Sequence, residues 1–215
     1  MPKKDLGFSL GAGFLIGILL LPVLKVAKPS LYDALALFIV PFFLIATPLG
    51  ALIAYKIGTR IAIIWQMAKY VVVGSMNTLV DIGILTLVIL ISKNFGIQAE
   101  DLIYSGMLAV TFYSIYKGFS FIVANVNSFY WNKYWTFSQK NTPKESPNQF
   151  IQFFVVSLIG LLINVVIASL VFRSIPPFAG LNPDQWGLIG AAAGSLSGMA
   201  WNFLGYKFIV FEKKV

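Results

Sequence analysis

Residues 70–92 read YVVVGSMNTLVDIGILTLVILIS, and Asp81 is the only charged residue in this run. A run of this length is enough for one helix across a bilayer, which needs about 20 apolar residues. The whole chain of 215 residues has a similar character, since 58% of its residues are hydrophobic and 11% are charged. Average proteins have about 45–50% apolar and about 25% charged residues. The composition therefore predicts an all-α integral membrane protein and excludes an ordinary soluble domain.

Five further segments are long and apolar enough to span a bilayer, so we predict six transmembrane helices. The six segments are Leu6–Leu24, Leu31–Tyr55, Tyr70–Ser92, Met107–Trp131, Phe150–Phe172 and Trp186–Phe208. Between the second and third, apolar residues from Ile57 to Ala68 share one helical face flanked by cations, which predicts a short helix in the membrane interface. The first segment has an alternative interpretation as a cleaved signal peptide, but Val26-Ala27-Lys28 is a poor cleavage site.

The cations are unevenly divided between the two sides of these predicted spans. If both termini lie on one side, that side carries 11 of the 16 Lys and Arg residues, the other carries 4, and Lys117 lies within a span. Cytoplasmic loops carry the excess of Lys and Arg, so we predict a protein of the cytoplasmic membrane with both termini in the cytoplasm. The net charge of +8 has two interpretations, namely the usual excess of cations on the cytoplasmic side and attraction of anionic lipid headgroups. We expect no nucleic-acid partner.

Several kinds of chemistry are excluded by composition, because the chain contains neither cysteine nor histidine. It cannot form disulfides, thiolate or histidine metal sites, or a histidine-based catalytic triad. Paired carboxylates for acid–base catalysis are also missing from the predicted spans. We therefore expect no enzyme, no metal site and no cofactor.

The last two thirds of the chain contain a weak internal repeat. Residues 66–73 (QMAKYVVV) align with residues 149–156 (QFIQFFVV), and residues 129–137 (FYWNKYWTF) align with residues 203–211 (FLGYKFIVF). The first offset matches Gly74 with Ser157, Asn77 with Gly160 and Asp81 with Asn164. Each pair of spans enters and leaves on one side, so we predict that the last four helices form two parallel two-helix repeats. Glycines at every fourth position of the last span predict close helix packing: Gly190, Gly194 and Gly198.

Two ionisable residues lie deep in the predicted spans. Asp81 comes 12 residues after Lys69, and Lys117 comes 16 residues before Lys133, distances of roughly 18 Å and roughly 24 Å along a helix. Charged groups at such depths are costly and usually functional. We expect Asp81 and Lys117 to neutralise each other. The pair has three interpretations, namely a structural ion pair, a polar site for a sugar or phosphate, and a protonatable carboxylate.

Other polar residues lie on the same helical faces or at the matching positions of the repeat. The predicted substrate-binding stripe comprises Asn77, Thr78, Asp81, Lys117, Asn127, Asn164 and Asn202. At the cytoplasmic end of the fourth span, cations and aromatic residues are either interfacial anchors or a headgroup site. For the second case the predicted phosphate-binding residues are Asn132, Lys133 and Lys207.

Two of these stretches resemble motifs of the GtrA-like family. Residues 73–81 (VGSMNTLVD) resemble the family's opening motif, and residues 132–137 (NKYWTF) resemble its Asn-Arg/Lys-x-Trp-x-Phe motif. The resemblance covers about residues 64–213. It implies a four-helix transmembrane core over residues 64–215, preceded by two extra helices and part of the interfacial helix over residues 1–63. The chain departs from the family pattern with Lys133, where Arg is common, and with Tyr206, where the repeat would place a second Asn.

The resemblance also implies a function in cell-surface polysaccharide synthesis. The expected activity is translocation (flipping) of a polyprenyl-phosphate-linked sugar across the cytoplasmic membrane, without catalysis. Two alternatives are a non-catalytic partner of a membrane polyprenyl-phosphate glycosyltransferase and a small proton-coupled exporter. The expected partners are therefore the lipid-linked sugar, membrane lipids and a glycosyltransferase, and a second copy of the chain is a further candidate.

Overall fold

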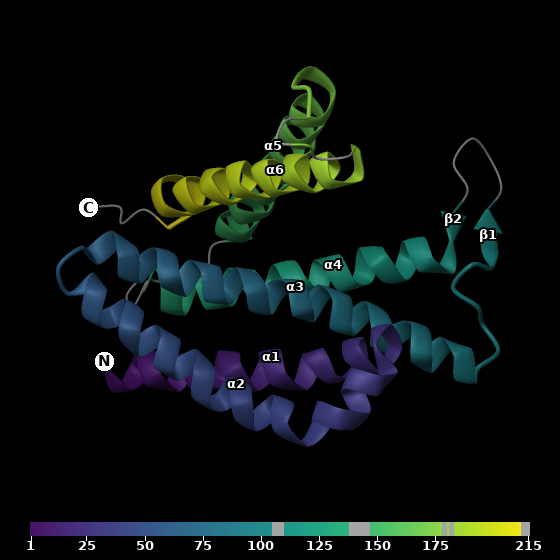
Figure 1. Cartoon of the computed structure of the whole chain (residues 1–215), viewed down its shortest axis with the longest axis horizontal. Helices are drawn as coiled ribbons and strands as arrows, with labels where there is room; N and C mark the ends of the chain where they lie inside the picture. The colour runs from purple at the N-terminus through teal and green to yellow at the C-terminus, as the bar shows by residue number, and fades with distance from the viewer. Residues whose placement is uncertain (105–109, 138–146, 178–179, 181–182, 212–215) are drawn as a thin grey trace. The chain divides into compact units, whose positions relative to one another are not determined.

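The structure is a computed structural model that describes residues 1–104, 110–137, 147–177, 180 and 183–211. The described residues form six α-helices, two π-helical turns and one two-stranded antiparallel sheet (Figure 1). The chain divides into two compact units, Met1–Ser138 and Gln139–Val215. The predicted all-α architecture with six helices is confirmed for the described part of the chain, with the small sheet as an addition.

The first unit is built on the helix α3, which spans Ala62–Asn94. The helices α1 (Lys3–Ala27) and α2 (Pro29–Gly58) form a hairpin that packs against α3. The helix α4 (Phe112–Trp131) lies along α3 as well and continues into the π-helical turn η1 (Asn132–Thr136). In Figure 1, α3 lies between α4 and the α1–α2 hairpin. The strands β1 (Leu102–Tyr104) and β2 (Val110–Thr111) pair between α3 and α4.

The second unit is a single helical hairpin. The helix α5 (Pro147–Ser174) packs along α6 (Pro183–Gly205), which continues into the π-helical turn η2 (Tyr206–Val210). A Cβ atom added at Gly198 would lie 2.6 Å from the backbone oxygen of Gly160, and one added at Gly190 would lie 2.9 Å from the backbone oxygen of Ala168. The close packing predicted from the glycine spacing is therefore confirmed.

Four helices among the described residues are long and apolar enough to cross a membrane: α1, α2, α3 and residues Asn148–Ser174 of α5. The helix α4 is shorter, at 20 residues, and it is more polar because Lys117, Asn125 and Asn127 lie within it. These findings support a membrane protein. The insertion of all six helices stays a prediction.

The predicted interfacial helix between the second and third spans is wrong. The helix α2 continues to Gly58 and α3 begins at Ala62, so only three residues separate them. The physical reason is a tight contact at this turn. Trp65 packs where a side chain on residue 58 would lie, and its ring meets the ring of Tyr55 edge-on at a centroid distance of 5.5 Å. Since Gly58 lacks a Cβ, α3 can start directly after α2.

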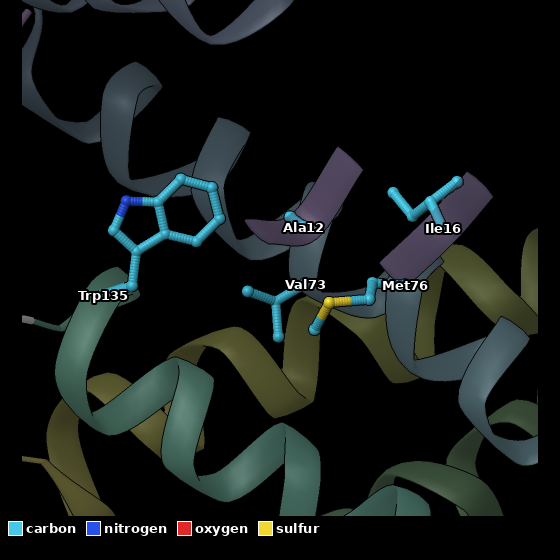
Figure 2. Close-up of a cluster of buried hydrophobic side chains, with 5 residues drawn as sticks. All are labelled: Ala12, Ile16, Val73, Met76 and Trp135. Atoms are coloured by element: carbon cyan, nitrogen blue, oxygen red, sulfur yellow. The ribbon is translucent and has the colours of Figure 1, made fainter. Parts of the chain in front are cut away.

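A cluster of buried side chains joins the N-terminal hairpin to the later helices. Figure 2 shows Ala12 and Ile16 from α1, Val73 and Met76 from α3, and Trp135 from η1. All five are buried, and four of them are completely inaccessible. Within the first compact unit, Met1–Ser138, buried packing thus joins α1 to α3 and η1. The predicted domain boundary between residues 63 and 64 stays a prediction.

Candidate functional site

The centre of the candidate site is an ion pair between α3 and α4. Lys117 Nζ donates to Asp81 Oδ2, and Ser120 Oγ donates to Asp81 Oδ1 at 2.6 Å. The predicted pairing of Asp81 with Lys117 is therefore confirmed, and Ser120 adds a second donor to the carboxylate. Both carboxylate oxygens have a donor, so the charge is compensated where desolvation is expensive.

This ion pair remains accessible from the outside of the hairpin. The Ser120 side chain is buried, whereas the side chains of Lys117 and Asp81 are 42% and 23% exposed. A group approaching along the hairpin would meet the ammonium of Lys117 first. The arrangement can therefore offer a cation, with a carboxylate behind it, to an anionic or hydroxyl-bearing ligand.

A second polar contact joins the same two helices, at a position one turn before Asp81 along α3. Asn127 Nδ2 donates to Asn77 Oδ1 at 3.4 Å, a long hydrogen bond. Thr78 does not join this pair, because its hydroxyl is exposed and donates to the backbone oxygen of Gly74 in its own helix. The predicted stripe in the first unit is thus organised as two levels, with Asp81 at one and Asn77 at the other.

The predicted stripe residues of the second unit lie in a tighter setting. Asn202 packs against Gly160, at the position where a side chain would be, and its Oδ1 is buried without a hydrogen-bond partner among the described residues. Asn164 packs against Gly194 and Gly198 of α6. Both asparagines therefore face the other helix of their hairpin at glycine positions, and whether they contact substrate stays a prediction.

The two π-helical turns place the predicted headgroup residues. Each turn is closed by a bond from the residue that follows it to the backbone oxygen of its first residue. Phe137 N donates to Asn132 O at 2.9 Å, and Phe211 N donates to Tyr206 O at 2.8 Å. The turns cover Asn132–Thr136 and Tyr206–Val210, which are the positions that the sequence alignment matches. Such turns occur often at functional sites.

Lys133 and Lys207 occupy the second position of these turns and have matching surroundings. The Lys133 ammonium lies 5.5 Å from the ring centroid of Phe129 and 5.6 Å from that of Tyr134. The Lys207 ammonium lies 5.9 Å from Phe203 and 5.3 Å from Phe208, the aligned residues. Within the described ranges no carboxylate pairs with either lysine. Aromatic faces stabilise such cations without neutralising them.

Burial limits what these residues can bind. Lys133 is only 4% exposed, whereas Lys207 is half-buried. Asn132 is buried and uses its Nδ2 within its own helix, donating to Ser128 O at 2.9 Å and to Ser128 Oγ at 3.2 Å. Its Oδ1 is buried and has no partner in the described part. This acceptor oxygen would repel a phosphate oxygen, and the side chain is buried, so the contact of Asn132 with a phosphate stays a prediction.

Sequence reasoning missed a polar cluster where α1 meets η1. Trp135 Nε1 donates to Asp5 Oδ1 at 3.0 Å, Lys69 Nζ donates to Trp135 O at 3.0 Å, and Lys69 Nζ lies 3.8 Å from Asp5 Oδ1. Lys4 Nζ donates to Tyr134 O at 2.7 Å. We call Lys4, Asp5, Lys69 and Trp135 the Asp5 cluster. An acid in an otherwise basic N-terminal stretch was its one signal, and nothing in the sequence indicated a partner.

Together the fold and the site define a helical membrane protein with a charged pair inside a helix hairpin. Residues 69–211, about two thirds of the chain, match the GtrA/DPMS transmembrane domain. The chain belongs to this family, which confirms the predicted resemblance and places the protein among membrane proteins of glycan synthesis. No curated protein and no solved structure matches the chain. The match begins at Lys69, so α1, α2 and the first turns of α3 lie outside it.

Proposed function

We propose that this protein translocates a polyprenyl-phosphate-linked sugar across the cytoplasmic membrane for cell-surface glycan synthesis. The family supports a role in glycan synthesis. The observation that carries the finer proposal is the ion pair of Asp81 and Lys117, supported by Ser120, on a hairpin whose surroundings are apolar. Ionisable groups are retained at such positions mainly for function.

A flipped lipid has two parts with opposite requirements. Transfer of a neutral polar group, such as a sugar hydroxyl, into hydrocarbon without a hydrogen-bond partner costs roughly 2–7 kcal/mol of free energy, and transfer of the charged phosphate costs more. Lys117 and Asp81, together with Asn77 and Asn127 further along the same helices, offer donors and acceptors along α3 and α4. The polyprenyl chain would stay in the lipid along the exposed apolar residues of these helices, such as Ile115, Phe119 and Ile122.

Each unit would offer the phosphate one cation, Lys133 in the first and Lys207 in the second, and only the half-buried Lys207 is open to direct contact. Each is a cation held between two aromatic rings and without a carboxylate partner in the described part. We also propose that α3–α4 and α5–α6 are parallel repeats whose π-helical turns lie at the cytoplasmic side, with both termini. The matched turns and ring contacts support this arrangement, and Asn164 and Asn202 would then line the path in the second repeat.

The alternatives predict a different use of the same residues. A glycosyltransferase partner needs the ion pair only for folding. A proton-coupled exporter needs a carboxylate that is free to bind a proton, and both oxygens of Asp81 already accept a hydrogen bond, from Lys117 and from Ser120. Of the three functions, translocation is the one that makes use of the accessible Lys117.

The test is transport in proteoliposomes with a labelled polyprenyl-phosphate hexose. We expect the protein to accelerate transbilayer movement, and Asp81→Asn and Lys117→Gln to reduce it by about tenfold or more, since about 1.4 kcal/mol of lost stabilisation is enough for that factor. The matched control is Thr86→Val in α3, because the Thr86 hydroxyl only donates to Ile82 O of its own helix.

Two results would contradict the proposal. One is a folded wild type that accelerates none of several lipid-linked sugars, in which case co-purification with a glycosyltransferase becomes the next measurement. The other is full transport by both folded ion-pair variants, which would leave the pair a structural role only.

A further inference from the structure

The end of the α4–η1 helix is capped by two lysines from other helices. The last carbonyl groups of a helix lack partners within it, and cations stabilise this end. Here Lys69 Nζ donates to Trp135 O at 3.0 Å and Lys4 Nζ donates to Tyr134 O at 2.7 Å. The capped carbonyls belong to Tyr134 and Trp135, the two residues after Lys133. Both caps therefore hold the turn that carries this lysine.

Among the described residues, the corresponding turn of the second unit is capped by a neutral side chain. Gln149 Nε2, from the start of α5, donates to Val210 O at 3.0 Å. The α5–α6 hairpin thus caps its own turn with a neutral amide. The α3–α4 hairpin uses a cation that is 6% exposed, and a buried cation requires a compensating charge.

Asp5 supplies that charge from outside the family domain. Its Oδ1 lies 3.8 Å from Lys69 Nζ and accepts a hydrogen bond from Trp135 Nε1 at 3.0 Å. It is therefore in contact with both the cap and the capped residue. The family match covers residues 69–211, so the cap of a family motif depends on a residue from the additional helix α1.

Apolar packing fixes α1 against the same turn. The ring of Phe8 stacks on the ring of Trp135 at 5.8 Å and meets the ring of Trp131 edge-on at 5.3 Å. One turn further along α1, Ala12 and Ile16 enter the cluster of Figure 2. Because these residues fix the N-terminal part of α1 against η1, they also fix the position of the Asp5 carboxylate.

We propose that Asp5 is a positioning residue for Lys133. By compensating Lys69, it keeps the cap on Trp135 O and so fixes the turn in which Lys133 lies between its two rings. The N-terminal hairpin is then a working part of the headgroup site and not only an added membrane anchor. The effect of Asp5 on lipid transport rests on the proposed function, whereas its effect on the position of Lys133 does not.

The test compares Asp5→Asn, the double variant Asp5→Asn/Lys69→Gln, and the control Asp33→Asn, an exposed acid of the same hairpin. The first readout is acylation of Lys133 by an amine-reactive reagent, followed by mass spectrometry of its peptide. We expect labelling to rise by about tenfold in Asp5→Asn. Removing the counter-charge of the buried Lys69 costs more than the ~1.4 kcal/mol that a tenfold change represents, so the cap is weakened and Lys133 becomes more accessible. Asp33→Asn should label like the wild type.

The double variant distinguishes a specific role from general destabilisation. With Gln at position 69 the cap becomes neutral, as it is at Gln149, and needs no counter-charge. We therefore expect slow labelling of Lys133 to return. The second readout is lipid transport, where Asp5→Asn should raise the apparent KM for the polyprenyl-phosphate hexose more than it lowers the maximal rate.

The outcomes separate this inference from the proposed function. If the wild type transports nothing, the function fails, while the labelling pattern still decides the role of Asp5. Unchanged Lys133 labelling in a folded Asp5→Asn variant would overturn the inference. So would an Asp5→Asn variant that does not fold and is not rescued by Lys69→Gln, since Asp5 would then serve folding alone.

Discussion

The α3–α4 and α5–α6 hairpins of the family domain both end in a π-helical turn, but the contacts between the two helices of each hairpin differ. In the α3–α4 hairpin, Ser120 donates to Asp81 at 2.6 Å. The aligned residues of the α5–α6 hairpin are Gly194 and Asn164, and a Cβ atom on Gly194 would lie 2.6 Å from Asn164 Oδ1. A side-chain hydrogen bond in one hairpin thus corresponds to a close backbone approach in the other.

This difference indicates a division of roles. The first hairpin keeps charged and polar groups between its helices and leaves Lys117 accessible. The second is closed by glycines, which let two backbones approach but offer no donor or acceptor side chains. The polar contacts of the first unit thus lie along α3 and α4, whereas the α5–α6 hairpin is closed at glycine positions against which Asn164 and Asn202 pack. Four predictions test this comparison, beginning with the largest expected change in stability.

The first prediction concerns the loss of one member of the ion pair. Lys117→Met should destabilise the protein by about 2–3 kcal/mol, somewhat below the about 3–5 kcal/mol of a fully buried pair, because it leaves the Asp81 carboxylate without its cation. The measurement is thermal unfolding in detergent micelles. The double variant Asp81→Asn/Lys117→Met should recover much of the loss, and equal stability of the single variant and the wild type would contradict this account.

The second prediction concerns the glycine contacts of the other hairpin. Gly198→Ala should cost about 1–3 kcal/mol, the usual range for overpacking, because the added Cβ would lie 2.6 Å from a backbone oxygen. The matched control is Gly118→Ala in α4, where an added Cβ meets nothing within 4 Å. If the division of roles is correct, Gly198→Ala protein that remains folded will still transport lipid, and a selective loss of transport would argue against it.

The third prediction concerns the hydroxyl contact at η2. Ser157 Oγ and Tyr206 Oη are 2.7 Å apart, and Tyr206 is buried against the ring of Phe153 at 4.2 Å. Tyr206→Phe should cost about 1 kcal/mol, the typical net value of one hydrogen bond. The control is Tyr130→Phe, whose ring is 40% exposed. An identical melting temperature for Tyr206→Phe and the wild type would show that this contact does not hold the turn.

Much of this comparison could be predicted from the sequence, because its signals are local or periodic. Helix length and hydropathy predicted the six helices, and the depths of Asp81 and Lys117 predicted their pairing. The contact of Asp5 with Trp135 joins residues 130 positions apart and leaves no periodic pattern. The tight turn at Gly58 and Trp65 depends on one missing Cβ, so the apolar face nearby was misinterpreted as a separate helix.

The fourth prediction has the smallest effect on stability and is the most informative about function. The hydrogen bond from Asn127 Nδ2 to Asn77 Oδ1 is 3.4 Å long, so Asn77→Ala should cost about 0.5 kcal/mol or less, the lower limit for a net hydrogen bond. If the sugar passes along α3 and α4, transport should nevertheless fall, because the amide is lost as a partner for hydroxyl groups. Asn125→Ala in α4 is the control, since the Asn125 amide donates to Phe121 O of its own helix at 2.9 Å. A fall in transport without a fall in melting temperature would separate the polar path from the fold, whereas parallel losses in both would return Asn77 to a structural role.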